Sequence, residues 1–223
     1  MKKKLLKCFL LSLFLIPHQG FCMPSLPKRS QLDALNQHCY DNCYQLWDRF
    51  PFPEVLPHWI MNDHNPTLGQ RVLDIGSGTG QLALWLQNQG FDVLCLDPSP
   101  VMVKCCRSKG LPCLQSTFQD YPNTKPFSVV LAILSFIHIP KKEWKEQLRK
   151  VANLLPPKGL FILALIEGEK EAIQETSTNF SRFFAYFNRE EVLKLTENEF
   201  ELLNFHSYPS SGNSYLLFAL RKR

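Results

Sequence analysis

The sequence has no hydrophobic run of membrane-spanning length, no C-x-x-C cysteine pair and no broad excess of one charge. The apolar stretch at residues 8–16 is shorter than the roughly 20 residues that a transmembrane helix needs. None of the eight cysteines forms a C-x-x-C pair, which excludes the common zinc-binding patterns. The first 22 residues hold four lysines and no acid, whereas the remaining 21 basic and 20 acidic residues nearly balance. A folded region so close to neutral disfavours a large nucleic acid as partner.

Residues 1–22 nevertheless have the layout of a secretory signal peptide. A lysine-rich start precedes the apolar stretch, and Pro17, Gly20 and Cys22 follow it. The cysteines further along the chain instead indicate free thiols and a reducing compartment. Three alternatives stay open. Translation from Met23 gives a cytoplasmic protein, retention of residues 1–22 gives a weak membrane tether, and a true signal peptide gives an exported protein.

From residue 31 on, the chain alternates between helix and strand patterns, which predicts an α/β fold. Helices are expected at residues 31–50, 53–61, 80–89, 99–109, 141–155 and 188–197. Strands are expected at residues 71–75, 91–96, 111–116, 127–134 and 159–166. Residues 200–208 and 214–223 form a terminal β-hairpin around a PSSGN turn. This order is typical of a doubly wound, Rossmann-like, mostly parallel sheet with an antiparallel C-terminal hairpin.

The segment VLDIGSGTG, residues 72–80, places a glycine-rich turn between the first strand and the following helix. In a doubly wound sheet this turn lies at the ligand-binding edge, where a ligand meets backbone N–H groups at a helix start. A dinucleotide fingerprint needs a third glycine at Gln81, so the G-x-G-x-G spacing departs from it. Asp97 ends the second strand, and its carboxylate can accept both hydroxyls of a ribose. Because Ser99 already supplies the cap of the next helix, we assign Asp97 to a ribose.

Four successive motifs resemble those of the class I S-adenosylmethionine-dependent methyltransferases, most closely the small-molecule type. They are VLDIGSGTG, VLCLDPSP, FSVVLAILSFIHIP and LLPPKGLFILAL. The resemblance runs from about residue 70 to the C-terminus and implies a seven-stranded sheet. It also implies three parts of the chain: the leader at 1–22, an N-terminal helical cap at 23–66 and a methyltransferase domain at 67–223.

The resemblance implies S-adenosylmethionine as cofactor and assigns residues to it by position. By this resemblance, the glycine turn and Asp74 form the surface that binds the methionine part of the cofactor, while Asp97 binds its ribose. The implied cofactor-binding residues are Asp74, Gly76, Ser77, Gly78, Gly80, Asp97, Pro98, Thr117, Phe118 and Ile133. Two positions depart from the family, which usually has aspartate where Thr117 and Ser128 stand.

Methyl transfer from a sulfonium needs a general base only if the acceptor must lose a proton. His138, after the fourth strand, is a candidate base, and a packing histidine is the alternative. Tyr40, on the first helix, corresponds to a tyrosine that in the family often closes over the cofactor, and an ordinary half-buried tyrosine is the alternative. Both are our catalytic candidates.

The acceptor cannot be deduced from these motifs. The Asn/Asp-Pro-Pro-Tyr element of enzymes that methylate adenine or glutamine nitrogen is absent after the fourth strand, where AILS stands. We therefore expect a small-molecule acceptor. A non-catalytic S-adenosylmethionine-binding module that acts through a protein partner is the alternative, and a nicotinamide-dependent oxidoreductase is a third, disfavoured interpretation.

Overall fold

The computed structural model describes residues 26–48, 55–63, 71–122, 126–175, 179–210 and 212–223. The leader and possible tether at residues 1–22 lie outside these ranges and stay a prediction, as does the division of the chain near residue 66. Within the described ranges, no helix combines the length and the hydropathy that crossing a membrane requires. The six cysteines of these ranges are free thiols.

The order of elements follows the pattern expected from the sequence. The helices are α1 (Arg29–Trp47), α2 (Val55–Asp63), α3 (Gln81–Asn88), α4 (Pro100–Ser108), η2 (Phe136–His138), η3 (Lys141–Glu143), α5 (Trp144–Leu154) and α6 (Arg189–Thr196). The strands are β1 (Arg71–Ile75), β2 (Asp92–Asp97), β3 (Cys113–Gln115), β4 (Val129–Ile133), β5 (Leu160–Ile166), β6 (Glu171–Glu175), β7 (Ser181–Ala185), β8 (Phe200–Ser210) and β9 (Asn213–Lys222).

Seven strands form one sheet in the order β3-β2-β1-β4-β5-β9-β8. Strands β3, β2, β1, β4 and β5 are parallel, whereas β9 runs antiparallel to β5 and pairs with β8 as a hairpin. The mostly parallel sheet with its antiparallel hairpin is therefore confirmed. The order reverses direction at β1, so the crevice beside the end of β1 is where a doubly wound sheet binds its ligand.

The middle of the sheet is apolar on both faces because helices cover it on both sides. Every residue of β5 is buried, and β4 is buried up to Ile133. On one helix, α5, the buried residues Trp144, Leu148 and Val151 recur at helical spacing, while its lysines and glutamates lie outside. Parallel strands that are buried on both faces have such continuous apolar runs.

The structure differs from the sequence-based prediction in an additional small sheet and in the start of the first helix. Strands β6 and β7 form a separate two-stranded sheet, whereas no strand was expected at residues 171–185. The first helix spans Arg29–Trp47 and so begins two residues earlier than expected. The aromatic residues Phe183 and Phe187 are fully buried in the core.

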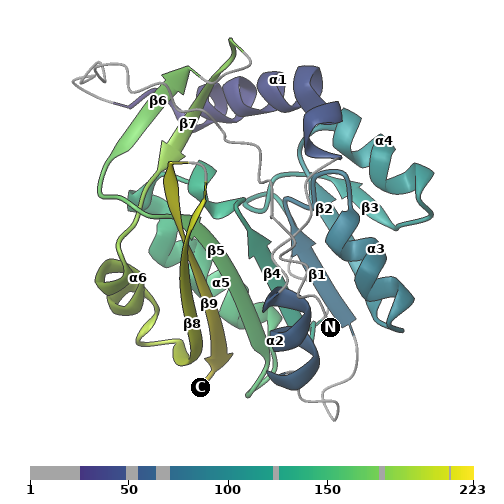
Figure 1. Cartoon of the computed structure of the whole chain (residues 1–223), viewed down its shortest axis with the longest axis vertical. Coiled ribbons are helices and arrows are strands. Elements are labelled where there is room, and N and C mark those ends of the chain that lie inside the picture. The colour runs from purple at the N-terminus through teal and green to yellow at the C-terminus, as the bar shows by residue number, and fades with distance from the viewer. Residues whose placement is uncertain (1–25, 49–54, 64–70, 123–125, 176–178, 211) are drawn as a thin grey trace, which may run out of the picture.

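Helix α1 and the β6–β7 sheet lie at the end of the main sheet toward which β1 and β4 point (Figure 1). Helix α1 packs against β7 and α4, so it bridges the two sides of that end. Helix α1 and the β6–β7 sheet thus cover the carboxyl ends of the parallel strands. This cover limits the access of water to a ligand bound there.

Candidate functional site

A cavity of about 290 Å³ lies between the ends of β1, β2 and β4 and the roof formed by α1. It brings together eleven of the twelve residues singled out from the sequence. These are Tyr40, Asp74, Gly76, Ser77, Gly78, Asp97, Pro98, Thr117, Phe118, Ile133 and His138. Residues more than 90 positions apart in the chain thus share one site because the parallel strands end at the same edge.

The twelfth residue, Gly80, is not among the cavity-lining residues and packs against α4 instead. It precedes α3 with φ +79°, and a side-chain Cβ there would lie 2.6 Å from Leu111 and 2.9 Å from the sulfur of Cys106. Both distances are too short for real atoms. Gly80 therefore allows α3 and α4 to approach, which is a packing role rather than a binding role.

The other two glycines of the turn have different reasons to lack a side chain. At Gly76, φ is +68° and a Cβ would clash with Ser135 at 2.4 Å, so the turn must pass close to the end of β4. At Gly78, φ is +54° and none of the described residues has an atom within 4 Å of a Cβ position. Because Gly78 lines the cavity, its bare backbone is accessible to a ligand.

Asp97 is buried at the end of β2 and accepts hydrogen bonds from two backbone N–H groups. The donors are Gly78 and Ser99, each at 2.9 Å from a carboxylate oxygen. Burial raises the pKa of Asp97 to about 7, although these two hydrogen bonds lower it. The carboxylate is thus tied to the glycine turn, and its ionisation is sensitive to pH near neutrality.

Ser99 caps α4, as the sequence indicated, because its Oγ accepts the Met102 N–H at 3.1 Å. The same hydroxyl donates to Asp41 of α1 at 2.5 Å. Ser99 therefore also links α1 to the N-terminus of α4. Asp97 is not needed as the cap of α4 and lines the cavity.

Asp74, on β1, is the second buried acid of the cavity. It is 4% exposed, and burial raises its pKa to about 7, with Cys106 and Asp97 raising it further. Two acids with pKa near 7 in one cavity are typical of a functional site.

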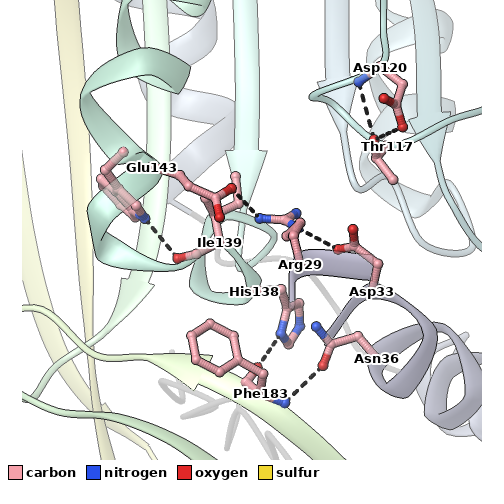
Figure 2. A network of polar contacts seen from close by, with 10 residues as sticks. Arg29, Asp33, Asn36, Thr117, Asp120, His138, Ile139, Glu143 and Phe183 are labelled. Carbon is pink, nitrogen blue, oxygen red and sulfur yellow. Dashed lines mark hydrogen bonds and ion pairs between the residues drawn. The ribbon is translucent and has the colours of Figure 1, made fainter. Parts of the chain in front are cut away.

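The loop after β3 is closed by Thr117, whose hydroxyl donates to the Asp120 carboxylate at 2.7 Å and accepts the Asp120 N–H at 3.2 Å (Figure 2). The Phe118 ring is buried in the core against Phe136. Thr117 lines the cavity, whereas its partner Asp120 is not among the cavity-lining residues.

A hydrogen-bonded network at the cavity joins α1, η2 and β7. His138 bonds through Nδ1 to the Phe183 carbonyl at 2.7 Å (Figure 2). Through Nε2 it bonds to Tyr40, also at 2.7 Å. Arg182 donates to the Tyr40 hydroxyl at 3.0 Å. A carbonyl only accepts, so Nδ1 carries the proton of His138 and Nε2 accepts the Tyr40 O–H.

The comparisons with known proteins agree on one family. A family model described as a methyltransferase domain matches residues 72–159. An uncharacterized methyltransferase of Oceanobacillus iheyensis is 24% identical over 185 residues, which are 77% of this chain and 87% of that protein. One from Staphylococcus carnosus is 28% identical over 140 residues, and the match spans 62% of this chain and 65% of that protein.

The chain belongs to the class I S-adenosylmethionine-dependent methyltransferases. Its methyl donor is S-adenosylmethionine. In fold, this methyltransferase is similar to the Burkholderia thailandensis 1,6-didemethyltoxoflavin-N1-methyltransferase, solved with 1,6-didemethyltoxoflavin and S-adenosylhomocysteine. The TM-score is 0.68 at 19% identity, covering 91% of this chain and 93% of that chain. A ubiquinone biosynthesis O-methyltransferase of Rickettsia bellii is 22% identical over 178 residues, covering 71% of this chain and 73% of that protein.

Buried polar atoms of this methyltransferase fit the cofactor that the family uses. Within the described residues, the Ser135 hydroxyl beside Gly76 and the Gln119 amide nitrogen beside Phe118 are buried without a hydrogen-bond partner. Both residues line the cavity. Donors and acceptors in these positions, together with the bare backbone at Gly78, suit a polar amino-acid part and an adenine edge.

The environment of His138 argues against its role as the general base of the methyltransferase. Its Nε2 lone pair already accepts the Tyr40 proton, and burial together with the charge of Arg182 lowers the pKa of His138 to about 3. A neutral histidine held by two hydrogen bonds orients Tyr40 rather than accepting a proton from an acceptor.

Replacement of His138 by glutamine should therefore leave the shape of the pH profile of methyl transfer unchanged. Loss of its bond to Tyr40 costs about 1 kcal/mol, or roughly fivefold in rate. An inflection near pH 7, caused by Asp74 and Asp97, should persist in the variant. The profile is measured as transfer of labelled methyl groups to the acceptor, and disappearance of that inflection in the variant would assign it to His138 instead.

Several cavity residues were not singled out from the sequence. They are Arg29, Asp33, Asn36, Gln37 and Met102 on helices and Tyr208 and Tyr215 on the β8–β9 hairpin. The α1 residues recur at helical spacing, which marks them as one face. Nothing local in the sequence tells whether a polar helix face is turned to solvent or to a cavity.

Proposed function

We propose that this methyltransferase transfers the methyl group to a small, largely uncharged organic molecule. The observation that carries the proposal is the aromatic part of the cavity wall. Tyr208 and Tyr215 line the cavity with rings stacked at 5.4 Å, and Phe136 lines it from η2. Aromatic walls with few polar groups are typical of small-molecule sites.

The charged residues Arg29 and Asp33, which line the cavity from α1, are paired with each other. Arg29 bonds to Asp33 at 2.7 Å and to Glu143 at 3.1 Å, so its charge is balanced by two acids (Figure 2). The roof formed by α1 also restricts access to a molecule of cavity size. Both features favour a small, neutral acceptor over a folded macromolecule.

Two of the similar proteins have names that support the same acceptor class. One is named for ubiquinone biosynthesis, and the other was solved with 1,6-didemethyltoxoflavin bound. Neither name identifies the acceptor of this chain, because the identities are only 22% and 19%.

In the proposed reaction, S-adenosylmethionine supplies a sulfonium-bound methyl group for in-line displacement. The residues of the chain supply orientation and exclusion of water. Asp97 and the turn at Gly78 hold the donor side, while Tyr40, fixed by His138 and Arg182, faces the acceptor side. No side chain has to accept a proton unless the acceptor enters in its protonated form.

The proposal is tested by incubating the full chain with methyl-labelled donor and a cell extract separated into low-mass, protein and nucleic-acid fractions. We expect label in the low-mass fraction, suppressed by S-adenosylhomocysteine and absent with the Asp97→Ala variant. Label confined to protein or nucleic acid would contradict the acceptor class. Binding of S-adenosylhomocysteine without any label transfer would indicate a non-catalytic module.

A further inference from the structure

Asn36 of α1 carries a buried hydrogen-bond donor that the described part of the chain does not satisfy. The residue is 6% exposed and lines the cavity, and its Nδ2 has no partner among the described residues. A buried donor without an acceptor carries the full cost of its lost hydration. Such a group in a native protein points to a ligand that supplies the missing acceptor.

The orientation of the Asn36 amide is fixed by β7. Its Oδ1 accepts the Phe183 N–H at 2.9 Å, while His138 donates to the carbonyl of the same residue at 2.7 Å. Exchange of the two amide ends would leave the Phe183 N–H facing a donor. Nδ2 is therefore turned away from β7, on the side of His138, as Figure 2 shows.

Asn36 is hydrogen-bonded to β7 and lies beside His138 of η2 (Figure 2). It lies on the same face of α1 as Arg29, Asp33 and Tyr40, all of which line the cavity. The glycine turn and Asp97, which are hydrogen-bonded to each other, stand at the ends of β1 and β2. A donor in this place can reach a molecule held between α1 and the strand ends.

We propose that Asn36 is a specificity-determining residue, which donates from Nδ2 to an oxygen of the methyl acceptor. This inference rests on the proposed function and adds to it the chemical class of the acceptor. The Arg29 charge is balanced by Asp33 and Glu143, and the buried Arg182, which donates to Tyr40, is not among the residues that line the cavity. The favoured oxygen is therefore a neutral carbonyl or hydroxyl, close to the position that is methylated, rather than a carboxylate.

The test uses the full chain saturated with S-adenosylhomocysteine and labelled with ¹⁵N at asparagine. The probes are acetophenone, which carries a ring carbonyl, and α-methylstyrene, the same shape without the oxygen. The side-chain amide of Asn36 is assigned through its contact with the Phe183 amide proton. We expect acetophenone to shift the Asn36 amide protons downfield and α-methylstyrene to leave them unshifted.

The Asn36→Asp variant separates recognition from folding, because its carboxylate still accepts the Phe183 N–H but donates nothing. Acetophenone should bind this variant about threefold to tenfold more weakly than it binds the wild type. S-adenosylhomocysteine should bind the variant and the wild type equally well. Asn42→Asp is the matched control, since Asn42 is exposed on the same helix. It should bind acetophenone as the wild type does.

Three results would overturn the inference. If the Asn36 protons shift on addition of S-adenosylhomocysteine alone, the donor serves the cofactor. If both probes shift them equally, or neither does, no acceptor oxygen is recognised. These wild-type spectra decide the matter even if Asn36→Asp does not fold. Failure of the proposed function would be seen separately, as S-adenosylhomocysteine binding without label transfer to low-mass acceptors.

Discussion

Substitution of alanine for Gly78 is expected to leave the methyltransferase folded but to weaken S-adenosylhomocysteine binding by roughly 10- to 100-fold. The expected loss follows from about 1–3 kcal/mol of steric overlap between the new methyl group and the ligand. Among the described residues no atom lies within 4 Å of the new Cβ, so we expect the methyl group to meet the ligand. Calorimetric titration measures the affinity, and thermal unfolding measures the stability.

Gly110 provides the matched control for this experiment. It also has positive φ, +78°, and open space at its Cβ position, but it does not line the cavity. Both alanine variants carry a similar backbone cost of about 1–2 kcal/mol for the left-handed conformation. Equal affinities for the two variants would contradict the placement of the ligand at Gly78.

Replacement of Asp97 by alanine is expected to weaken S-adenosylhomocysteine binding by roughly 10²- to 10⁴-fold. A carboxylate that accepts two hydroxyls contributes about 1.5–3 kcal/mol per hydrogen bond. The change also leaves the N–H groups of Gly78 and Ser99 without their acceptor, so a loss of stability accompanies it. Asp97→Asn retains one acceptor oxygen and should show a smaller loss of both stability and affinity.

The raised pKa of Asp97 gives this prediction a pH dependence. Burial raises the folded-state pKa from 3.8 to about 7, so the carboxylate becomes ionised as pH rises through about 7. An ionised acceptor holds the ribose better, and affinity should therefore rise with pH across this range in the wild type. Asp97→Asn should lose that rise. An affinity that is independent of pH in the wild type would contradict the ribose role.

Stability has the opposite dependence on pH. The folded state keeps protons on Asp97 and Asp74 up to about pH 7, whereas the unfolded chain loses them near 3.8. The folded state thus binds more protons between these values, and these two acids lower the stability as pH rises from about 4 to about 7. The affinity and the stability are therefore expected to have opposite trends over this interval.

Much of the fold is local in origin and could be predicted. Strands β4 and β5 are continuous apolar runs, and Ser99 marks the start of α4 by the chemistry of its hydroxyl. The β6–β7 sheet was not predictable in this way. The sequence of β6 is largely polar, and this strand exists because it pairs with β7, whose Phe183 and Phe184 are buried in the core.

The candidate site likewise has features that could be predicted from the sequence and features that could not. The glycine turn and Asp97 were predictable because they are fixed by their own strand ends. The tautomer of His138 depends on Phe183 and Tyr40, which lie 45 and 98 residues away in the chain. The position of the Asn36 amide nitrogen, which has no partner among the described residues, depends on the same tertiary packing. No pattern along the sequence shows which polar helix face is turned inward.

The most direct measurement is a calorimetric titration of the full chain with S-adenosylhomocysteine, with a nicotinamide dinucleotide titrated in parallel. The account predicts saturable binding of the nucleoside to a single site, strongly reduced by Gly78→Ala and preserved by Gly110→Ala, and no binding of the dinucleotide. Absence of heat with S-adenosylhomocysteine, or equal binding of the dinucleotide, would contradict it.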